Sequence, residues 1–229
     1  MRRLLLIGNS RWHWGDWVDG RLIEQRHTTA EAGVALLMSE PVDYWAAVGL
    51  VPQALDAHSV VRLRTRQVPL AQLPPRLGVD RALAAWMAWR ISGLPVLVAD
   101  AGTALSLTLV DGGGCFRGGR LMAGAKLQLQ ALHQGTASLP LSSLEGVTRE
   151  LWPRLTDEAL SCGVIEGLTA AVLRGFEHRP EPEQDWQLWL TGGDAPLLLR
   201  GLQQKGLRPL HADALALEGL GCLVETLRS

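Results

Sequence analysis

The stretch VLVADAGTA, residues 96–104, places an acidic residue at the end of an apolar run. Asp100 ends that run, and Gly102 and Thr103 follow it. Desolvating a lone carboxylate is costly, so Asp100 requires a cation or hydrogen-bond donors. Small residues beside it let a ligand approach the backbone. An acid, a glycine and a hydroxyl in this order favour a site for a cation or a phosphate group.

The N-terminus repeats this arrangement about ninety residues earlier. Gly8 aligns with Gly102, and the turn signal Asp19-Gly20 aligns near Asp111-Gly112, which predicts strand, tight loop, strand, turn and strand in both places. The position that matches Asp100 holds Leu6. Two similar half-domains, each with a loop facing a shared phosphate group, explain the repeat. Two ordinary hairpins with glycine at their turns explain it as well.

Helices and further strands must position these loops, and the sequence alternates between the two throughout. Apolar periodicity and proline or glycine breaks predict the following elements: strand, helix and strand within 41–68, a helix within 77–94, a helix ending near Gly135, a helix over 155–174, and a strand at 187–193 followed by a helix. Asp80 at the start of the second helix is a candidate base or a helix cap. Thr156 is a candidate N-cap. Three tryptophans in the first hairpin, Trp12, Trp14 and Trp17, have strand spacing and favour packing over a ligand cage.

Bulk properties exclude several classes of protein. The chain has 229 residues and a net charge of −1, which argues against a nucleic-acid surface that neutralises phosphates. The apolar run after Arg3 is too short for an export signal, and we expect no membrane-spanning stretch. Three scattered cysteines predict neither a disulfide framework nor a zinc site. We therefore expect a cytoplasmic protein.

Seven short motifs, in this order and spacing, resemble type III pantothenate kinases. They are GNSR at 8–11, LGVDR at 77–81, DAGTA at 100–104, GGRLMAG at 118–124, TASLP at 136–140, Thr156 with Gly163 seven residues later, and TGGDA at 191–195. That family belongs to the actin-like, sugar-kinase-like ATPase superfamily. The resemblance implies an α/β fold of duplicated actin-like (ribonuclease H-like) half-domains, residues 1–92 and 93–229, with a nucleotide cleft between them.

The resemblance also implies ATP-dependent phosphorylation of pantothenate to 4′-phosphopantothenate, the first step of coenzyme A biosynthesis. It implies Mg²⁺ bound with ATP, a monovalent cation (K⁺ or NH₄⁺) at Asp100, and a homodimer in which Thr156 reaches the partner's site. On the residues alone, Asp100 is the stronger candidate base, but the resemblance assigns that role to Asp80. The other implied contacts are to ATP, from Leu6, Ile7, Gly8, Asn9, Ser10, Arg11, Trp12, His13 and Thr103, and to pantothenate, from Gly78, Val79, Asp80, Arg81 and Thr156.

The chain also departs from the family pattern. Leu6 stands where most members carry an aspartate that helps to organise the divalent metal, and Ala123 replaces a proline. Pro74 and Pro75 lie where a tyrosine often precedes the GxDR segment. These departures leave a second hypothesis open, namely a nucleotide-binding family member that acts as a regulatory or accessory protein. We expect neither a nucleic acid nor a membrane as a partner.

Overall fold

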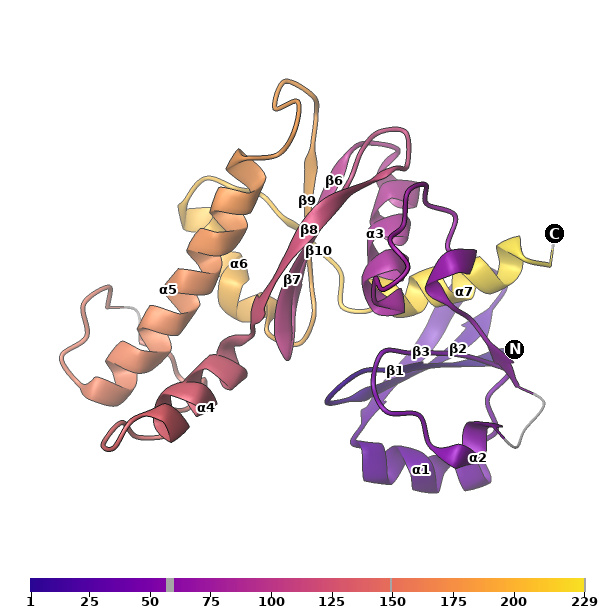
Figure 1. Ribbon diagram of the computed structural model, residues 1–229, viewed down its shortest axis with the longest axis horizontal. Helices are drawn as coiled ribbons and strands as arrows, with labels where there is room; N and C mark the ends of the chain where they lie inside the picture. The colour runs from indigo at the N-terminus through magenta and orange to yellow at the C-terminus, as the bar shows by residue number, and fades with distance from the viewer. Residues whose placement is uncertain (57–59, 149, 229) are drawn as a thin grey trace. The chain divides into compact units, whose positions relative to one another are not determined.

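The chain forms two compact units, which are described separately (Figure 1). The computed structural model describes residues 1–56, 60–148 and 150–228. The first unit comprises Met1–Val96, Val110–Arg117 and Ala214–Ser229, and the second comprises Leu97–Leu109 and Gly118–Asp213. This division by contacts differs from the expected halves 1–92 and 93–229, because the last helix packs on elements near the N-terminus. Ser229 itself lies outside the described residues.

The first unit is built on a five-stranded sheet. Its strands are β1 (Arg2–Ile7), β2 (Trp12–Val18), β3 (Arg21–Thr28), β4 (Tyr44–Ala47) and β5 (Val61–Arg62). They lie in the order β3-β2-β1-β4-β5, with β1, β2 and β3 antiparallel and β4 and β5 parallel to β1. The predicted Asp19-Gly20 turn joins β2 to β3, and both residues have positive φ, at 46° and 79°.

Helices cover both faces of this sheet (Figure 1). They are α1 (Ala30–Ser39), α2 (Gln53–Asp56), α3 (Val79–Ser92) and α7 (Leu215–Thr226), with a 3₁₀ turn η1 (Thr65–Gln67). The helix expected within 41–68 is α2, and residues 57–59 beyond it lie outside the described part of the chain. Trp12 and Trp14 are buried in the core beneath α1, and Trp17 is buried against α7, so the packing interpretation of the tryptophans is confirmed.

The second unit repeats the strand order of the first. Its strands are β6 (Val96–Ala101), β7 (Ala104–Val110), β8 (Phe116–Ala123), β9 (Gln187–Thr191) and β10 (Leu210–His211). They lie in the order β10-β9-β6-β7-β8, which is the first sheet's order read from the other edge. In each sheet the opening hairpin lies on one side of the first strand and the later two strands lie on the other. The α/β class and the predicted duplication are therefore confirmed.

Three helices complete the second unit: α4 (Ala125–Gly135), α5 (Thr156–Glu177) and α6 (Ala195–Gln204). Their buried side chains share one core with β6, β7 and β9. Figure 1 shows α5 and α6 side by side along this sheet, in agreement with their packing. The loops that follow β6 and β9 are thereby held on a rigid layer.

The expectation that no stretch is long enough to span a membrane is wrong for one helix. Helix α5 has 22 residues and a mean hydropathy of 1.4 in its most apolar window, which suffices by length and composition. In this fold the helix belongs to a packed layer, because Val164, Ile165, Leu168 and Val172 are buried in the core of the second unit. Its hydropathy therefore matches a core helix.

Candidate active site

The loop between β1 and β2 is the predicted first phosphate loop. The amide of Gly8 donates to the carbonyl of Arg11 over 3.0 Å, which closes the loop into a tight turn. Asn9, Ser10 and Arg11 are exposed at its tip. The amide of Gly8 already has a protein acceptor, so a phosphate group would be bound by the groups at the tip. The turn pre-shapes the loop, because its backbone geometry is fixed before a ligand arrives.

The residues on either side of this loop, which were also predicted to contact ATP, have side chains buried in the core. Leu6, Ile7 and Trp12 are buried side chains of the first unit's core, and the ring of Trp12 lies against Gly33 of α1. These three residues can reach a nucleotide only through their backbone. A buried leucine offers no oxygen to a metal, so the first unit lacks a metal ligand at position 6.

His13 follows the loop on β2 and faces His27 of β3. The two rings meet edge to face with their centroids 4.8 Å apart. Burial, helped by the charges of His27 and Arg11, lowers the pKa of His13 to about 4. His13 is therefore a neutral imidazole at pH 7, which can donate or accept a hydrogen bond but adds no positive charge to the loop.

Gly49 packs on the phosphate loop, and sequence reasoning missed it. It follows β4, and its amide and that of Val48 donate to the carbonyl of Ile7, over 3.3 and 2.9 Å. A β-carbon at position 49 would overlap the carbonyl oxygen of Gly8. The available signal was a glycine directly after an apolar strand, because such a glycine often marks a close approach of two backbones.

The predicted substrate segment lies beside the same backbone. Gly78 is the N-cap of α3, and a β-carbon there would lie 3.3 Å from Cγ1 of Val48. Asp80 follows in the first turn, where one carboxylate oxygen accepts the amide of Arg81 over 2.7 Å. Val79 is buried and Arg81 is half-buried. Val48 thus lies beside the start of the helix that carries Asp80, and the adjacent Gly49 lies against the loop at Gly8.

The pKa of Asp80 is raised, although its place at a helix start by itself favours a lowered pKa. First-turn amides and the neighbouring Arg81 lower its pKa, but desolvation by burial outweighs them and raises the pKa above its ordinary value. A raised pKa strengthens the carboxylate as a proton acceptor, since it brings the pKa closer to the operating pH.

In the second unit, Asp100 and Thr103 lie at the short loop between β6 and β7, and two glycines pack closely against this loop. Asp100 is half-buried near the end of β6, and Thr103 is exposed. Gly124, the N-cap of α4, donates its amide to the carbonyl of Thr103 over 2.9 Å, and a β-carbon there would overlap the carbonyl oxygen of Gly102. The loop is therefore shaped by Gly124, the last residue of the GGRLMAG motif at 118–124.

Gly192 approaches the same loop from the other side. It has φ +92°, and a β-carbon there would lie 2.5 Å from a carboxylate oxygen of Asp100. The amide of Asp194 donates to the carbonyl of Ala101 over 2.8 Å. Gly192 follows β9 as Gly49 follows β4, and each lies against the loop that follows the first strand of its sheet. The duplicated fold has therefore kept one glycine position in both halves.

Thr156 lies at the start of α5 in the second unit. It is the first residue of α5 and is exposed, and the N-cap is Leu155, without a side-chain cap. The interpretation of Thr156 as an N-cap is therefore wrong by one residue. Its exposure leaves its side chain available to a ligand or to another chain.

The residues present fit a metal ion that binds together with the phosphates of a ligand, and they do not form a metal site by themselves. Within residues 1–56, 60–148 and 150–228, no three His, Cys, Asp or Glu side chains gather as a metal site. Mg²⁺ is commonly bound by one or two carboxylates together with substrate phosphates. Asp100 provides one such carboxylate in the second unit, and ATP phosphates and water would provide the remaining ligands.

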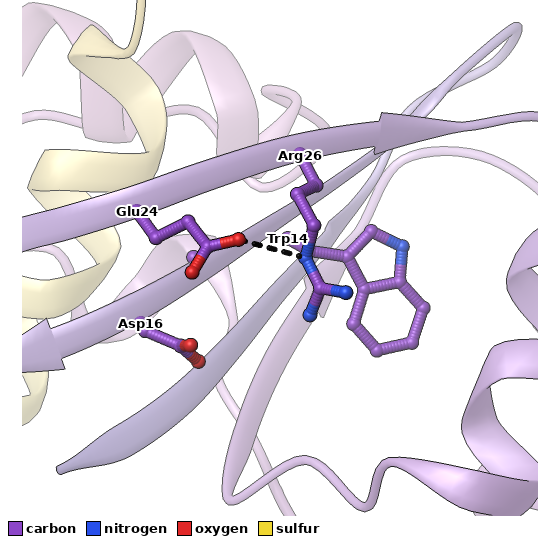
Figure 2. A pocket seen from close by; sticks show the side chains of 5 residues that line it. Trp14, Asp16, Glu24 and Arg26 are labelled. Carbon is purple, nitrogen blue, oxygen red and sulfur yellow. Dashed lines mark ion pairs between the residues drawn. The ribbon is translucent and has the colours of Figure 1, made fainter.

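A small hollow on β2 and β3 is a different feature, closed by ion pairs. Figure 2 shows Trp14 and Asp16 of β2 beside Glu24 and Arg26 of β3, and Gly15 completes the lining. The guanidinium of Arg26 lies 3.6 Å from Glu24, as the dashed line in Figure 2 marks. Asp16 in turn pairs with Arg3, so every charged group that lines the hollow already has an ion-pair partner and the hollow offers a ligand little.

Comparison with known proteins identifies the family of this chain. A family model described as type III pantothenate kinase matches residues 53–178. The type III pantothenate kinase of Synechococcus elongatus is 36% identical over 222 residues, which cover 87% of each chain. That of Thermosynechococcus vestitus is 37% identical over 201 residues, which cover 85% of this chain and 78% of the relative.

Solved structures support the fold. A Campylobacter jejuni protein assigned to the Baf family of transcriptional activators superposes with a TM-score of 0.67 at 16% identity, covering 99% of this chain and 98% of that one. Component A of the Acidaminococcus fermentans (R)-2-hydroxyglutaryl-CoA dehydratase superposes with a TM-score of 0.57 at 12% identity, covering 95% and 93%. At such identities these likenesses concern the actin-like fold alone. The sequence matches decide the family: this chain belongs to the type III pantothenate kinases.

Proposed function

We propose that this protein phosphorylates pantothenate with ATP to give 4′-phosphopantothenate, the first step of coenzyme A biosynthesis. One observation carries the proposal beyond family membership. Within the first unit, Gly49 packs on the closed phosphate loop, and the side chain of the adjacent Val48 lies beside Gly78, the N-cap of the helix that carries the desolvated carboxylate of Asp80. Phosphoryl transfer needs little more from a protein than positioning, charge stabilisation and a group that accepts the hydroxyl proton.

In this proposal, the first unit binds the ATP phosphates and pantothenate and provides the base. Asn9, Ser10 and Arg11 bind the phosphates of ATP at the exposed loop tip, and the neutral imidazole of His13 lies beside them. Asp80 accepts the proton of the pantothenate hydroxyl as that oxygen attacks the γ-phosphorus. Arg81 binds the pantothenate carboxylate, because its planar guanidinium matches a carboxylate with two parallel hydrogen bonds. The raised pKa of Asp80 supports its role as the base.

The second unit provides a cation site and a further phosphate contact. Asp100 is half-buried, so a monovalent cation, K⁺ or NH₄⁺, offsets the cost of desolvating its charge. Thr103 donates its hydroxyl to a phosphate oxygen of the nucleotide. The close packing of Gly124 and Gly192 against this loop supports the proposal, because it limits the conformations that the loop can adopt. Mg²⁺ enters with ATP, since Leu6 offers it no ligand.

A homodimer completes the site in this proposal. Gly163 and Gly167 leave open space on the exposed side of α5, so another helix can approach closely. Large apolar side chains are exposed around the same helix in the second unit: Leu127, Leu132, Leu141, Leu151, Trp152 and Leu155. Trp152 is 90% exposed, an unusual state for so large an apolar group. A two-fold dimer that covers this face would deliver Thr156 to the pantothenate of the partner.

We place this enzyme in the cytoplasm, where ATP is available. Its cysteines support that location, since Cys115, Cys162 and Cys222 are free thiols. A disulfide-forming compartment would oxidise an accessible thiol, and Cys115 is partly accessible.

An assay of ADP release by the purified protein tests the proposed function. ADP formation is followed with and without pantothenate, in potassium and in sodium buffer. We expect pantothenate to stimulate ADP formation, most strongly in potassium. ATP binding without any pantothenate-dependent ADP release, under every cation tried, would reject the kinase and match a nucleotide-binding accessory protein instead.

A further inference from the structure

Three exposed arginines of the first unit gather around one hydrogen bond. The hydroxyl of Thr65 in η1 donates to the carbonyl of Leu77 over 2.8 Å and ties two loop segments together. Arg64 and Arg66 flank Thr65, and Arg76 directly precedes Leu77. All three side chains are exposed. We call Arg64, Arg66 and Arg76 the arginine surface.

The arginine surface has no compensating acids among the side chains that the structure describes. None of its three guanidinium groups takes part in an ion pair there. Other arginines of the same unit behave differently. Arg3 lies 3.0 Å from Asp16. Arg26 pairs with Glu24, as Figure 2 shows, and also with Glu40.

Like charges held close together repel one another, so an unpaired cluster on a protein of net charge −1 has a cost. Residues 62–81 contain five arginines, and Asp80 is the one acid among them. A positive potential confined to this segment attracts anions specifically to it.

This surface lies next to the predicted substrate segment. Leu77 accepts the hydrogen bond of Thr65 and stands three residues before Asp80. Three residues span at most roughly 10 Å, which is close to the Debye length of about 8 Å at physiological salt. The field of the arginine surface therefore reaches Asp80.

We propose that the arginine surface captures the anionic substrates, ATP and pantothenate, by electrostatic attraction and speeds their association with the site. The inference rests on the proposed function for the identity of the anions. The surface does not contact the bound substrates, so it raises the association rate and leaves the dissociation rate unchanged. Its effect grows with the charge of the ligand and falls as salt is added.

Stopped-flow binding of fluorescent ATP and ADP to the full chain tests this inference. The nucleotides are free of magnesium, so that ATP carries one more negative charge than ADP. The variant Arg66→Gln/Arg76→Gln removes two charges from the surface. At an ionic strength of about 0.01 M we expect ATP to associate about five-fold more slowly, and ADP to be slowed less. At about 0.5 M the difference should fall below about two-fold for both nucleotides.

Arg21→Gln/Arg228→Gln is the matched control, because both arginines are exposed in the same unit and the charge change is equal. Arg21 follows the turn at the end of β2 that is remote from the phosphate loop. Glu225, near Arg228, contacts that end too, since it accepts the indole N–H of Trp17 over 2.9 Å. The seven residues of β2 span about 23 Å. The control should therefore change the association rates little.

Three results would overturn the inference. The surface variant and the control could associate equally fast at low salt. The variant could release ATP faster without binding it more slowly, which would indicate direct contact. The slower association could also persist unchanged at high salt. Because turnover plays no part in this measurement, an absence of pantothenate-dependent ADP release would reject the proposed function and leave these rates to be judged by themselves.

Discussion

Gly49 lies so close to the carbonyl oxygen of Gly8 that a β-carbon at position 49 would occupy the place of that oxygen. The contact joins two backbones, and neither can move as a flexible side chain would. The shape of the phosphate loop therefore depends on a residue forty positions away that touches no predicted ligand through a side chain.

Gly49→Ala should displace the phosphate loop and weaken ATP binding. Forcing one extra carbon into a packed contact costs roughly 1–3 kcal/mol, so we expect a loss of about ten-fold or more in ATP affinity. Binding calorimetry measures this loss. Gly135→Ala is the control, because a β-carbon there meets nothing within 4 Å. Unchanged ATP affinity in Gly49→Ala would show that the loop adapts freely.

Asp80→Asn should lower turnover by about 10²–10⁴-fold, the usual effect of removing a general base. The amide oxygen can still accept the Arg81 N–H, so the helix start is preserved. Burial raises the pKa of Asp80, which means that the fold disfavours its charged form above that pKa. The melting temperature at pH 7 should therefore be unchanged or higher, with the difference vanishing below the ordinary pKa of aspartate, about 3.9. Near-normal turnover would make Asp80 structural.

His13→Gln should reduce the loss of unfolding free energy that the protein shows as the pH falls from 7 to 4.5. The unfolded chain protonates His13 near pH 6.5, but the folded chain does so only at about pH 4. Stability from this group is thus fully present above pH 6.5 and is lost as the pH falls towards 4, by about 3 kcal/mol at most. Denaturant unfolding at pH 7 and pH 4.5 measures it, with exposed His178→Gln as the control. Equal losses in both variants would contradict the shifted pKa.

Asp100→Ala should abolish the difference between potassium and sodium. A half-buried carboxylate needs a cation to offset its desolvation, and removing the carboxylate removes the cation's site. Pantothenate-dependent ADP release in KCl and in NaCl measures this preference. Asp185→Ala, an exposed acid of the same unit, should keep it. A wild-type protein that works equally well in sodium would refute the cation role.

Mixing Asp80→Asn with Thr156→Arg, each inactive alone, should restore activity. If Asp80 and Thr156 act on one substrate from different chains, each mixed dimer holds one intact site. Random exchange should recover about a quarter of the wild-type activity. A mixture of Asp80→Asn with the double variant Asp80→Asn/Thr156→Arg contains no intact site and serves as the control. A mixture that stays inactive after verified subunit exchange, or a fully active monomer, would reject the shared site.

The sequence by itself determined the elements, the loops and the family. Asp19-Gly20 predicted the turn between β2 and β3 correctly. Both positions have positive φ, and aspartate and glycine adopt positive φ more readily than most residues do. The apolar periodicity around Trp86 gave α3 correctly. Turns and helices depend mainly on residues that are close in sequence, so the sequence alone is enough to predict them. The seven motifs in order added the family, and the matches confirmed it.

Tertiary structure decided what depends on residues distant in sequence. The close approaches of Gly49 and Gly192 exist only once β4 lies beside β1 and the β9–α6 turn lies against the loop after β6. The direction of the Asp80 pKa shift required its burial, since a helix start alone predicts the opposite. The arginine surface required the hydrogen bond between Thr65 and Leu77. Desolvation and electrostatic fields depend on distances in space, and a sequence fixes those distances only through the fold.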